Sequence, residues 1–433
     1  YNTGWMNGDI KLATLSDTDD TNVTGPSILT NYNFSSGNLT GWTLTSADAG
    51  GGIYANQNPV YVATSLVGIG NTGSVRQNIT VETGKKYIVG YKCDRRSSSQ
   101  FRLGIYFGHI GGSIVFDDTV ANGQTRLYYW TSDYTGTTLL QFRGRGGGDG
   151  EFTNFIFDEV EEDRSANGNG LQVFGTVTKN PVATGADLVA YSGWSQSGGA
   201  YSSGVNYLNY PHTTALGTSD FHFAAWLKFS TDGGQQTILS SMEADGQYAG
   251  PYLSTYTSGT VYMGMYTANQ TNAIQTPYQI ANGAPNIADN TWHHAVFTKS
   301  GTNAKVYIDG KFTVESNSFY STTATFDVMN IGANYRPFNG SIALLRLSAT
   351  APSAEQIKKM YNDEKFLFQE NAKATLYGSS DAVTALAYDD DTELLHAGTS
   401  AGRSVFQGLR RIDNTTDAVG AAISASNGMV AED

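Results

Sequence analysis

The chain has 433 residues, with 26 Lys+Arg against 39 Asp+Glu and a formal net charge of −13. This length exceeds the roughly 100–200 residues of one ordinary domain, so two or three domains are expected. The acidic balance argues against binding to nucleic-acid phosphates, because such binding needs clustered cations. We therefore expect no nucleic-acid partner. No apolar run approaches the roughly 18–20 residues of a membrane helix, so we also expect no membrane span.

The residue pattern favours an all-β protein. Hydrophobic residues make up 39% of the chain, charged residues only 15%, and there are 50 glycines. Apolar and polar residues alternate in short runs separated by Gly, Asn, Asp and Ser, with almost no helical periodicity. We therefore predict two β-sandwich (jelly-roll) domains in tandem, a short helix, and a C-terminal three-stranded meander like one propeller blade.

Residues 1–25 are predicted to form one strand, over 9–15, followed by a linker. Residues 26–163 are expected to form the first sandwich, and residues 164–185 a connector with a short strand over 171–177. Within the first sandwich, strand-like runs recur about every 8–15 residues, which suits a two-sheet jelly roll. The predicted strands cover 60–67, 73–79, 86–93, 101–107, 126–130, 138–143 and 152–160.

Three segments of this domain, LTNYNFSSGNLTGWT, QNITVETGKKYIVGYKC and FTNFIFDEV, resemble a galactose-binding-like, carbohydrate-binding β-sandwich. The resemblance implies a structural calcium between the opening loop and a late acidic residue, here Asn33 and Asp158. Ser35 and Ser36 depart from the family pattern, because an acidic ligand is usual there.

Sugar binding requires an aromatic face for the pyranose ring and polar groups for its hydroxyls. Tyr128, Tyr129 and Trp130 lie in one strand, and Tyr128 and Trp130 share a face that is equally well read as core. The predicted ligand-binding residues of this domain are therefore Tyr129, Arg143, Arg145 and Asp149.

Residues 186–350 are predicted to form the second sandwich. The runs FHFAAWLKFS, TWHHAVFTK and AKVYIDGKFTV, closed by MNIGANYRPFNGSIALLRLSATAPSAEQI, resemble the laminin-G, concanavalin A-like β-sandwich. Asp309-Gly310 predicts a tight hairpin turn between strands 305–308 and 311–314. The resemblance explains Trp292-His293-His294 as a framework feature, with the two histidines on opposite faces of a strand. Loop residues Tyr335, Arg336 and Asn339 are ligand-binding candidates, and Asp245 is a candidate for a calcium at the rim.

The last 83 positions divide into a helix over 351–370 and a meander over 371–433. Ser353 and Gln356 form a capping box, and Ile357, Met360, Tyr361, Glu364 and Phe368 lie on one face that suits packing on the sandwich. The meander is predicted to have strands over 383–388, 394–399 and 403–409. A lone meander exposes an unpaired edge, so it must pair with strand 9–15, with another chain, or with a missing portion.

Catalysis finds little support in the sequence. Glycanases with this fold usually carry Glu-x-Asp-x-x-Glu on one strand, whereas Glu243-Ala244-Asp245 lacks the third acid and runs into Gly246. Hydrolysis also needs two carboxylates roughly 5–9.5 Å apart across a cleft. We therefore predict that the protein is not an enzyme.

Two stretches, NGNGLQVFGTVTKNPVATGADLVAYSG and TLYGSSDAVTALAYDDDTELLHAGTSAGRSVFQGLRRIDNTT, resemble bacteriophage tail-fibre or related virion adhesion proteins. The resemblance implies a non-enzymatic protein at a virion surface or outside cells. Such a protein recognises a cell-surface glycan as a homo-oligomer joined through terminal β-strands, because weak sugar sites gain strength from multivalency. Two alternatives remain: a subunit of an extracellular helical filament assembled by β-strand addition, and a glycan-cleaving depolymerase.

Overall fold

The computed structural model describes residues 10–12, 17–25, 29, 40–46, 53–55, 67–70, 73–96, 98–110, 114–119, 122, 124–147, 149–161, 165, 168, 170–197, 204–211, 220–231, 234–242, 248–256, 258–266, 285–317, 328–332, 336–373, 376–377, 382–408, 410–417, 423–426 and 429–432. The chain divides into two compact units. The first unit comprises residues 24–162 and 169–175, and the second comprises 1–23, 163–168 and 176–433. Strand β2 (Val23–Thr24) lies at the boundary.

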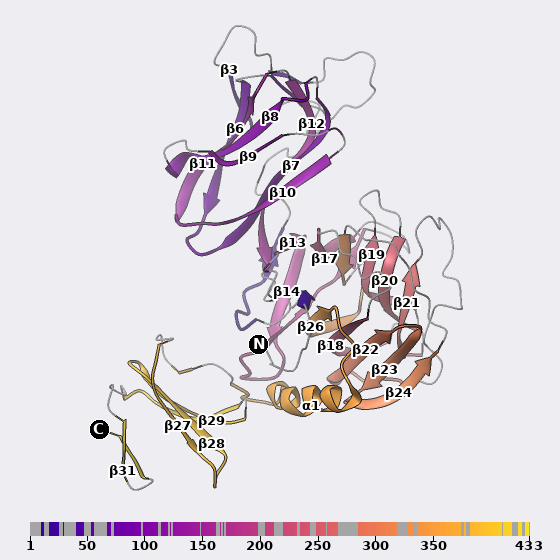
Figure 1. Cartoon of the computed structure of the whole chain (residues 1–433), viewed down its shortest axis with the longest axis vertical. Coiled ribbons are helices and arrows are strands. Elements are labelled where there is room, and N and C mark those ends of the chain that lie inside the picture. The colour runs from indigo at the N-terminus through magenta and orange to yellow at the C-terminus, as the bar shows by residue number, and fades with distance from the viewer. Residues whose placement is uncertain are drawn as a thin grey trace. The chain divides into compact units, whose positions relative to one another are not determined.

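The first unit is a sandwich of two antiparallel sheets (Figure 1). One sheet has the order β10 (Gln124–Thr131), β7 (Lys86–Arg96), β12 (Asp149–Glu161), β13 (Leu171–Phe174). In the same sheet, β5 (Val67–Gly70) also pairs with β12, and β4 (Ile53–Ala55) pairs with β5. The other has the order β3 (Thr43–Ser46), β6 (Gly73–Val81), β11 (Gly136–Arg145), β8 (Arg102–Phe107), β9 (Ile114–Thr119), and η1 (Gly108–Ile110) follows β8. These strands confirm the predicted sandwich; of predicted strand 60–67, only Val67 lies among the described residues.

Alternation along each strand sends one set of side chains into this sandwich. In β11, Leu140 and Phe142 are fully buried, whereas Gln141 and Arg143 are half-buried on the outer face. Phe142 stacks on Phe155 of β12 at 4.2 Å, which joins the two sheets through their aromatic rings. Aromatic contacts of this kind dominate the core of the first unit.

The second unit contains another two-sheet sandwich. One sheet has the order β14 (Thr176–Pro181), β15 (Val189–Ser192), β26 (Gly340–Ser348), β18 (Phe221–Phe229), β22 (His293–Ser300), β23 (Asn303–Ile308), β24 (Lys311–Ser316). The other has the order β17 (Gly204–Tyr210), β25 (Val328–Ile331), β19 (Gln236–Met242), β20 (Tyr248–Thr255), β21 (Val261–Tyr266), with β16 (Ser195–Gln196) paired to β17. The predicted connector strand 171–177 is interrupted at Gly175, whose φ of 65° separates β13 from β14.

The N-terminal strand has a partner in its own chain. Strand β1 (Ile10–Leu12) pairs antiparallel with β26, with Ile10 opposite Ser348. One option from the sequence was that this strand completes the C-terminal meander; the structure places it on the sandwich instead. This pairing engages one edge of β1 within its own chain.

A helix covers the outer face of the β18 sheet, as predicted. It comprises α1 (Ala354–Glu364) and η3 (Lys365–Phe368), and Ser353 and Gln356 form the expected capping box. Trp226 of β18 stacks on Phe368 at 4.1 Å. Because the helix covers one face and the second sheet the other, β18 is buried on both faces until Lys228.

A buried charge cluster joins this helix to the sheet. Glu364 Oε1 accepts a 2.6 Å bond from Arg346 Nη1, and its Oε2 accepts a 2.8 Å bond from Trp226 Nε1. All three side chains are buried. His294 lies against Trp226 at 5.2 Å, and burial lowers the pKa of His294 to about 4, so the imidazole is neutral near pH 7. The prediction that the two neighbouring histidines are framework residues fits this packing.

His293 points the other way, onto the hairpin turn between β23 and β24. Asp309 and Gly310 both have positive φ, 52° and 71°, as the predicted tight turn requires. His293 Nδ1 lies 2.8 Å from Asp309 Oδ2, and His293 Nε2 lies 3.3 Å from Asp289 Oδ1. The hydrogen bond to Asp309 raises the pKa of His293 above its usual value.

This contact predicts a pH-dependent stability. A raised pKa in the folded state gives stability that is fully present below the unfolded pKa of about 6.5 and is lost as pH rises through the folded pKa. Wild-type protein should exceed His293→Gln in unfolding free energy by a few tenths to about 1 kcal/mol at pH 5.5. The difference should shrink by pH 8.5. Urea denaturation at both pH values measures it, and an equal gap at both would contradict the assignment.

The C-terminal meander has four strands where three were predicted: β27 (Val383–Asp389), β28 (Leu394–Thr399), β29 (Gly402–Gln407) and β30 (Arg410–Thr415). The predicted third strand ends early because Gly408, with φ of 61°, allows the chain to turn back into β30. A separate hairpin, β31 (Ile423–Ser426) with β32 (Met429–Glu432), follows. On β27, Leu386 is 66% exposed and Tyr388 is 58% exposed.

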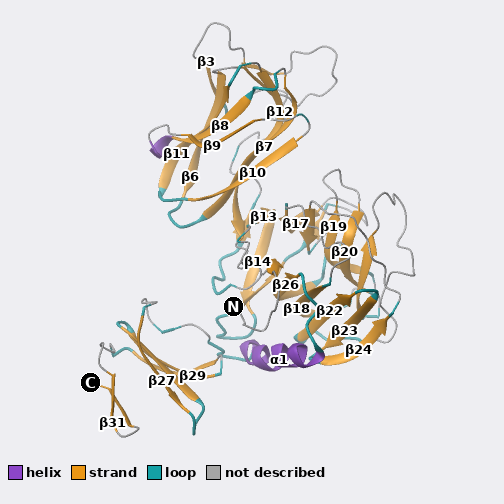
Figure 2. Ribbon diagram, in the orientation of Figure 1, coloured by secondary structure: helices purple, strands orange, loops and turns teal. Residues whose placement is uncertain are grey.

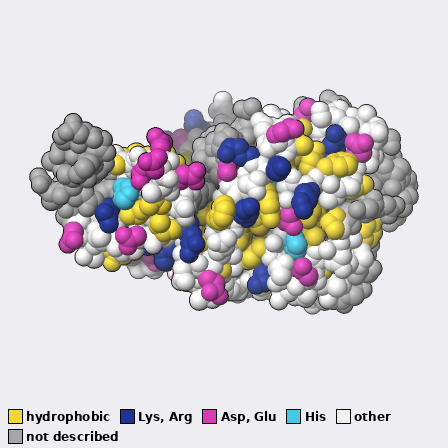
Figure 3. Space-filling model, turned by 90° about the horizontal axis from the view of Figure 1, so that it is seen from below, with side chains coloured by type: hydrophobic (Ala, Val, Ile, Leu, Met, Phe, Trp, Pro, Cys, Tyr) yellow, Lys and Arg dark blue, Asp and Glu magenta, His cyan; other side chains and the backbone are white. Residues whose placement is uncertain are grey.

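Strands dominate the described chain, and α1 is its one α-helix (Figure 2). None of the described helices is long and apolar enough to cross a membrane. On the face seen in Figure 3, acidic and basic side chains are interspersed among hydrophobic ones.

Candidate functional site

The sequence candidates of the first unit lie on two different sheets. Tyr129 is on the outer face of β10, where its hydroxyl donates to the Gly170 carbonyl at 2.9 Å and its ring packs beside Ile88, Ile156 and Val160. Tyr128 and Trp130 pack against the main core, as their shared face suggested. Tyr129 therefore serves as an anchor for the chain near Gly170 in this structure.

Arg143 and Arg145 lie on the outer face of β11, in the opposite sheet. Arg145 Nη1 pairs with Asp117 Oδ2 at 2.7 Å, and Arg102 contacts the same carboxylate. Asp149 opens β12, opposite Gly70. Tyr129 and the two arginines therefore face away from opposite sheets of one sandwich and do not converge on a single ligand.

The predicted calcium ligands are only partly within the described residues. Asp158 is buried in β12, and its Oδ2 accepts a 2.7 Å bond from Gln172 Nε2. Asn33 and Asp245 lie outside the described residues. Among the described residues, no group of three His, Cys, Asp or Glu side chains could hold a metal. A structural calcium therefore stays a prediction.

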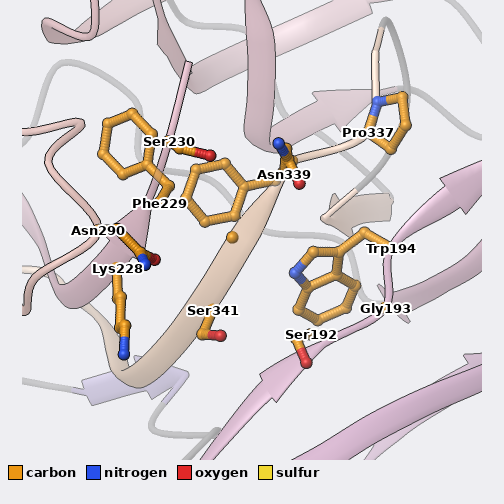
Figure 4. Close-up of a pocket in the computed structure, with 12 residues that line it drawn as sticks. Ser192, Gly193, Trp194, Lys228, Phe229, Ser230, Asn290, Pro337, Asn339 and Ser341 are labelled. Atoms are coloured by element: carbon orange, nitrogen blue, oxygen red, sulfur yellow. The ribbon is translucent and has the colours of Figure 1, made fainter. Parts of the chain in front are cut away.

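In the second unit, Asn339 lines a pocket of about 520 Å³ at the end of the sandwich (Figure 4). The pocket lies where β15 and β18 end and β26 begins. Its lining comprises Ser192, Gly193, Trp194, Lys228, Phe229, Ser230, Asn290, Pro337, Phe338, Asn339, Gly340 and Ser341. Arg336, also predicted, is exposed just before this segment, and Tyr335 lies outside the described residues. The volume falls in the range of roughly 300–1,000 Å³ typical of small-molecule sites.

Aromatic side chains form the apolar part of the pocket. Trp194 is 7% exposed, and Phe229 and Phe338 are buried. The indole of Trp194 lies against Gly332, where a Cβ would come within 2.1 Å of the ring. Gly332 also accepts a 2.9 Å bond from the Phe338 backbone N–H, so one glycine positions two aromatic walls.

A buried amide fixes the polar rim. Gln236 of β19 is fully buried; its Oε1 accepts a 3.0 Å bond from the Asn339 N–H, and its Nε2 donates to the Ser230 carbonyl at 3.1 Å. The Asn290 N–H donates to the Phe229 carbonyl at 3.0 Å. Hydrogen bonds to the backbone of Asn339, Ser230 and Phe229 thus hold the rim in place. The side chains of Asn290 and Asn339 make no hydrogen bond to another described residue.

One buried donor of the pocket is also unpaired. Trp194 Nε1 has no hydrogen-bond partner among the described residues, although it is buried. In Figure 4 the indole nitrogen is directed toward the side of the pocket on which Ser341 lies. A buried unsatisfied donor costs about 1–3 kcal/mol, so its retention suits a site whose ligand supplies an acceptor.

The sequence pointed to this pocket through Asn339 alone. Trp194, Lys228 and the three serines were missed. Trp194 sits in a connector-like run, YSGWSQSGG, and Lys228 lies near the end of an apolar strand. The Gly193-Trp194 pair, which directly follows strand β15, was the sequence signal that could have indicated this site. The pocket exists only because β15, β18 and β26, which are far apart in sequence, are neighbours in one sheet.

The fold and this pocket define a two-sheet β-sandwich with a ligand-sized site at its end. Residues 202–358 match the family described as "Concanavalin A-like lectin/glucanases superfamily". The match confirms the laminin-G, concanavalin A-like resemblance over that segment. No curated protein matches the chain.

Several solved structures are similar at low identity. The binding domain of Paraclostridial Mosquitocidal Protein 1 is 14% identical with a TM-score of 0.37, over 59% of this chain and 64% of that one. The botulinum neurotoxin serotype D binding domain is 14% identical, also with a TM-score of 0.37, over 63% of this chain and 66% of that one. The binding domain of botulinum neurotoxin DC in complex with rat synaptotagmin II is 16% identical with a TM-score of 0.37, over 59% and 60%. The chain thus covers under two thirds of the first of these structures, and nothing about its ligands follows from likenesses at this level.

Proposed function

We propose that this protein is a non-enzymatic glycan-binding adhesion protein, and that the pocket at Trp194 and Asn339 holds the sugar. The observation that carries the proposal is the combination of aromatic walls with unengaged hydroxyl and amide groups in one pocket. Sugar sites need both, because pyranose rings have apolar faces and hydroxyl edges. The described lining holds no Asp or Glu, so it does not supply the paired carboxylates of glycoside hydrolysis.

A glycan array probed with the full chain tests this proposal. We expect specific binding, and a 2- to 10-fold loss of affinity in Asn339→Ala, about the value of one neutral hydrogen bond. Asn339 is exposed and its backbone N–H is kept, so the variant should fold. The matched control is Asn78→Ala, an exposed asparagine on β6 of the first unit. Specific binding that is untouched by Asn339→Ala would remove the pocket from the proposal.

We also propose that the protein forms a homo-oligomer, as part of a virion appendage or of another extracellular assembly. Strand β27 is an edge strand with exposed Leu386 and Tyr388; Asp389 ends it, and Asp390 and Asp391 follow. The opposite edge strand, β30, begins with Arg410 and Arg411 at the same end of the sheet. Pairing β27 of one copy with β30 of the next would continue the antiparallel order and bring opposite charges together.

Light scattering after size-exclusion chromatography measures this association. We expect wild type at a multiple of 46.4 kDa and Leu386→Glu at the mass of one chain. Phe366→Glu, an exposed hydrophobic residue of η3, is the control and should leave the mass unchanged. A monomeric wild type would refute the self-association.

A further inference from the structure

Three polar side chains form a row across neighbouring strands at the pocket. Lys228 of β18 lies directly opposite Ser341 of β26. On the other side of β26, Ile342 is opposite Tyr191, so Ser341 and Ser192 are the next neighbours across that antiparallel pair. Opposite residues share a face with Cβ atoms about 4.5–5.5 Å apart, so the row spans roughly 10 Å. All three line the pocket (Figure 4).

The charge of Lys228 is not balanced within the described chain. Lys228 is half-buried and makes no ion pair or hydrogen bond to another described residue. By contrast, the buried Lys179 pairs with Asp17 at 2.6 Å, and the half-buried Lys373 pairs with Asp187 at 2.9 Å. In a chain of net charge −13, an ammonium beside a pocket without a carboxylate suits an anionic ligand.

Two polar groups of the pocket are donors that cannot accept, and the hydroxyls in the row are free to donate to a ligand. Trp194 Nε1 and the Lys228 ammonium can only donate, and the hydroxyls of Ser192 and Ser341 make no hydrogen bond to another described residue. Neutral sugar hydroxyls donate as well as accept, and so are best held where acceptors such as carboxylates are present. A carboxylate only accepts, and its hydrogen bonds to charged donors are the strong ones.

We propose that the pocket selects a sugar acid, a saccharide unit whose carboxylate contacts Lys228 and the neighbouring serine hydroxyls while its ring lies toward Trp194 and Phe338. The inference rests on the proposed glycan-binding function and names its ligand class. The aromatic walls favour a ring-bearing ligand over a small inorganic anion, because an inorganic anion would leave them uncovered.

Titration calorimetry of the full chain with two tetrasaccharides, one of uronic acid and one neutral, tests the proposal. We expect the acidic tetrasaccharide to bind at least tenfold more tightly, with an affinity that falls as salt rises. Lys228→Gln should abolish the preference, and Lys228→Arg should keep much of it. The control is Lys311→Gln, an exposed lysine at the start of β24 that changes the net charge equally.

The outcomes separate the two proposals. Equal binding of both tetrasaccharides, or a preference that survives Lys228→Gln, would overturn the sugar-acid inference and leave glycan binding intact. Competition by inorganic phosphate as strong as by the uronic tetrasaccharide would also overturn it, because the site would then accept any anion. Failure of both tetrasaccharides, together with a glycan array without specific signal, would refute the glycan-binding function itself.

Discussion

Replacing Glu364 by glutamine is expected to lower the free energy of unfolding of the second unit by about 3–5 kcal/mol. The carboxylate accepts from both Arg346 and Trp226 in a site that is fully buried. An amide would present one NH₂ group to a donor and would leave the guanidinium without a counter-charge. The lost contacts join helix α1 and strands β18 and β26, so the helix should detach more readily.

Calorimetry and urea denaturation of the full chain measure this loss. Glu370→Gln is the control, because Glu370 is exposed just beyond η3 and should change stability by less than about 0.5 kcal/mol. The double variant Arg346→Met/Glu364→Leu should recover part of the loss, since an apolar pair removes the buried charges together. A single-variant cost below about 1 kcal/mol would show that the pair contributes little to folding.

Gly332→Ala is the second large expected effect, and it acts on both stability and binding. The residue has φ of 86°, and an added Cβ would lie 2.1 Å from the Trp194 ring. Left-handed backbone costs a side-chain-bearing residue about 1–2 kcal/mol, and overpacking adds about 1–3 kcal/mol. Because Gly332 also holds Phe338, the pocket walls should shift and glycan affinity should fall more than tenfold.

Gly301→Ala separates the two causes. Gly301 also has positive φ, 58°, but nothing lies within 4 Å of an added Cβ. The Gly301→Ala variant should therefore lose only the cost of left-handed backbone, about 1–2 kcal/mol in the free energy of unfolding. Its glycan binding should be unchanged. Equal costs for Gly332→Ala and Gly301→Ala would mean that the contact with Trp194 carries no strain.

Local signals predicted the regular elements well. Asp309-Gly310 specified its hairpin because few residues accept positive φ, and Ser353 with Gln356 specified the start of α1 through the capping box. Misreadings occurred where a single glycine turned the chain: Gly175 splits the connector strand and Gly408 creates the fourth strand of the meander. A glycine permits such a turn without requiring it, so sequence pattern alone does not settle the outcome.

The sequence by itself determined the all-β character, the sandwich order and the helix, because these follow from alternation, turn residues and caps that act over a few neighbours. Tertiary structure decided where the site lies. The sequence candidates Tyr129 and Arg143 belong to opposite sheets, whereas Lys228, Ser341 and Ser192 meet in one row. Strand pairing joins residues more than a hundred positions apart, and no local pattern records which strands become neighbours.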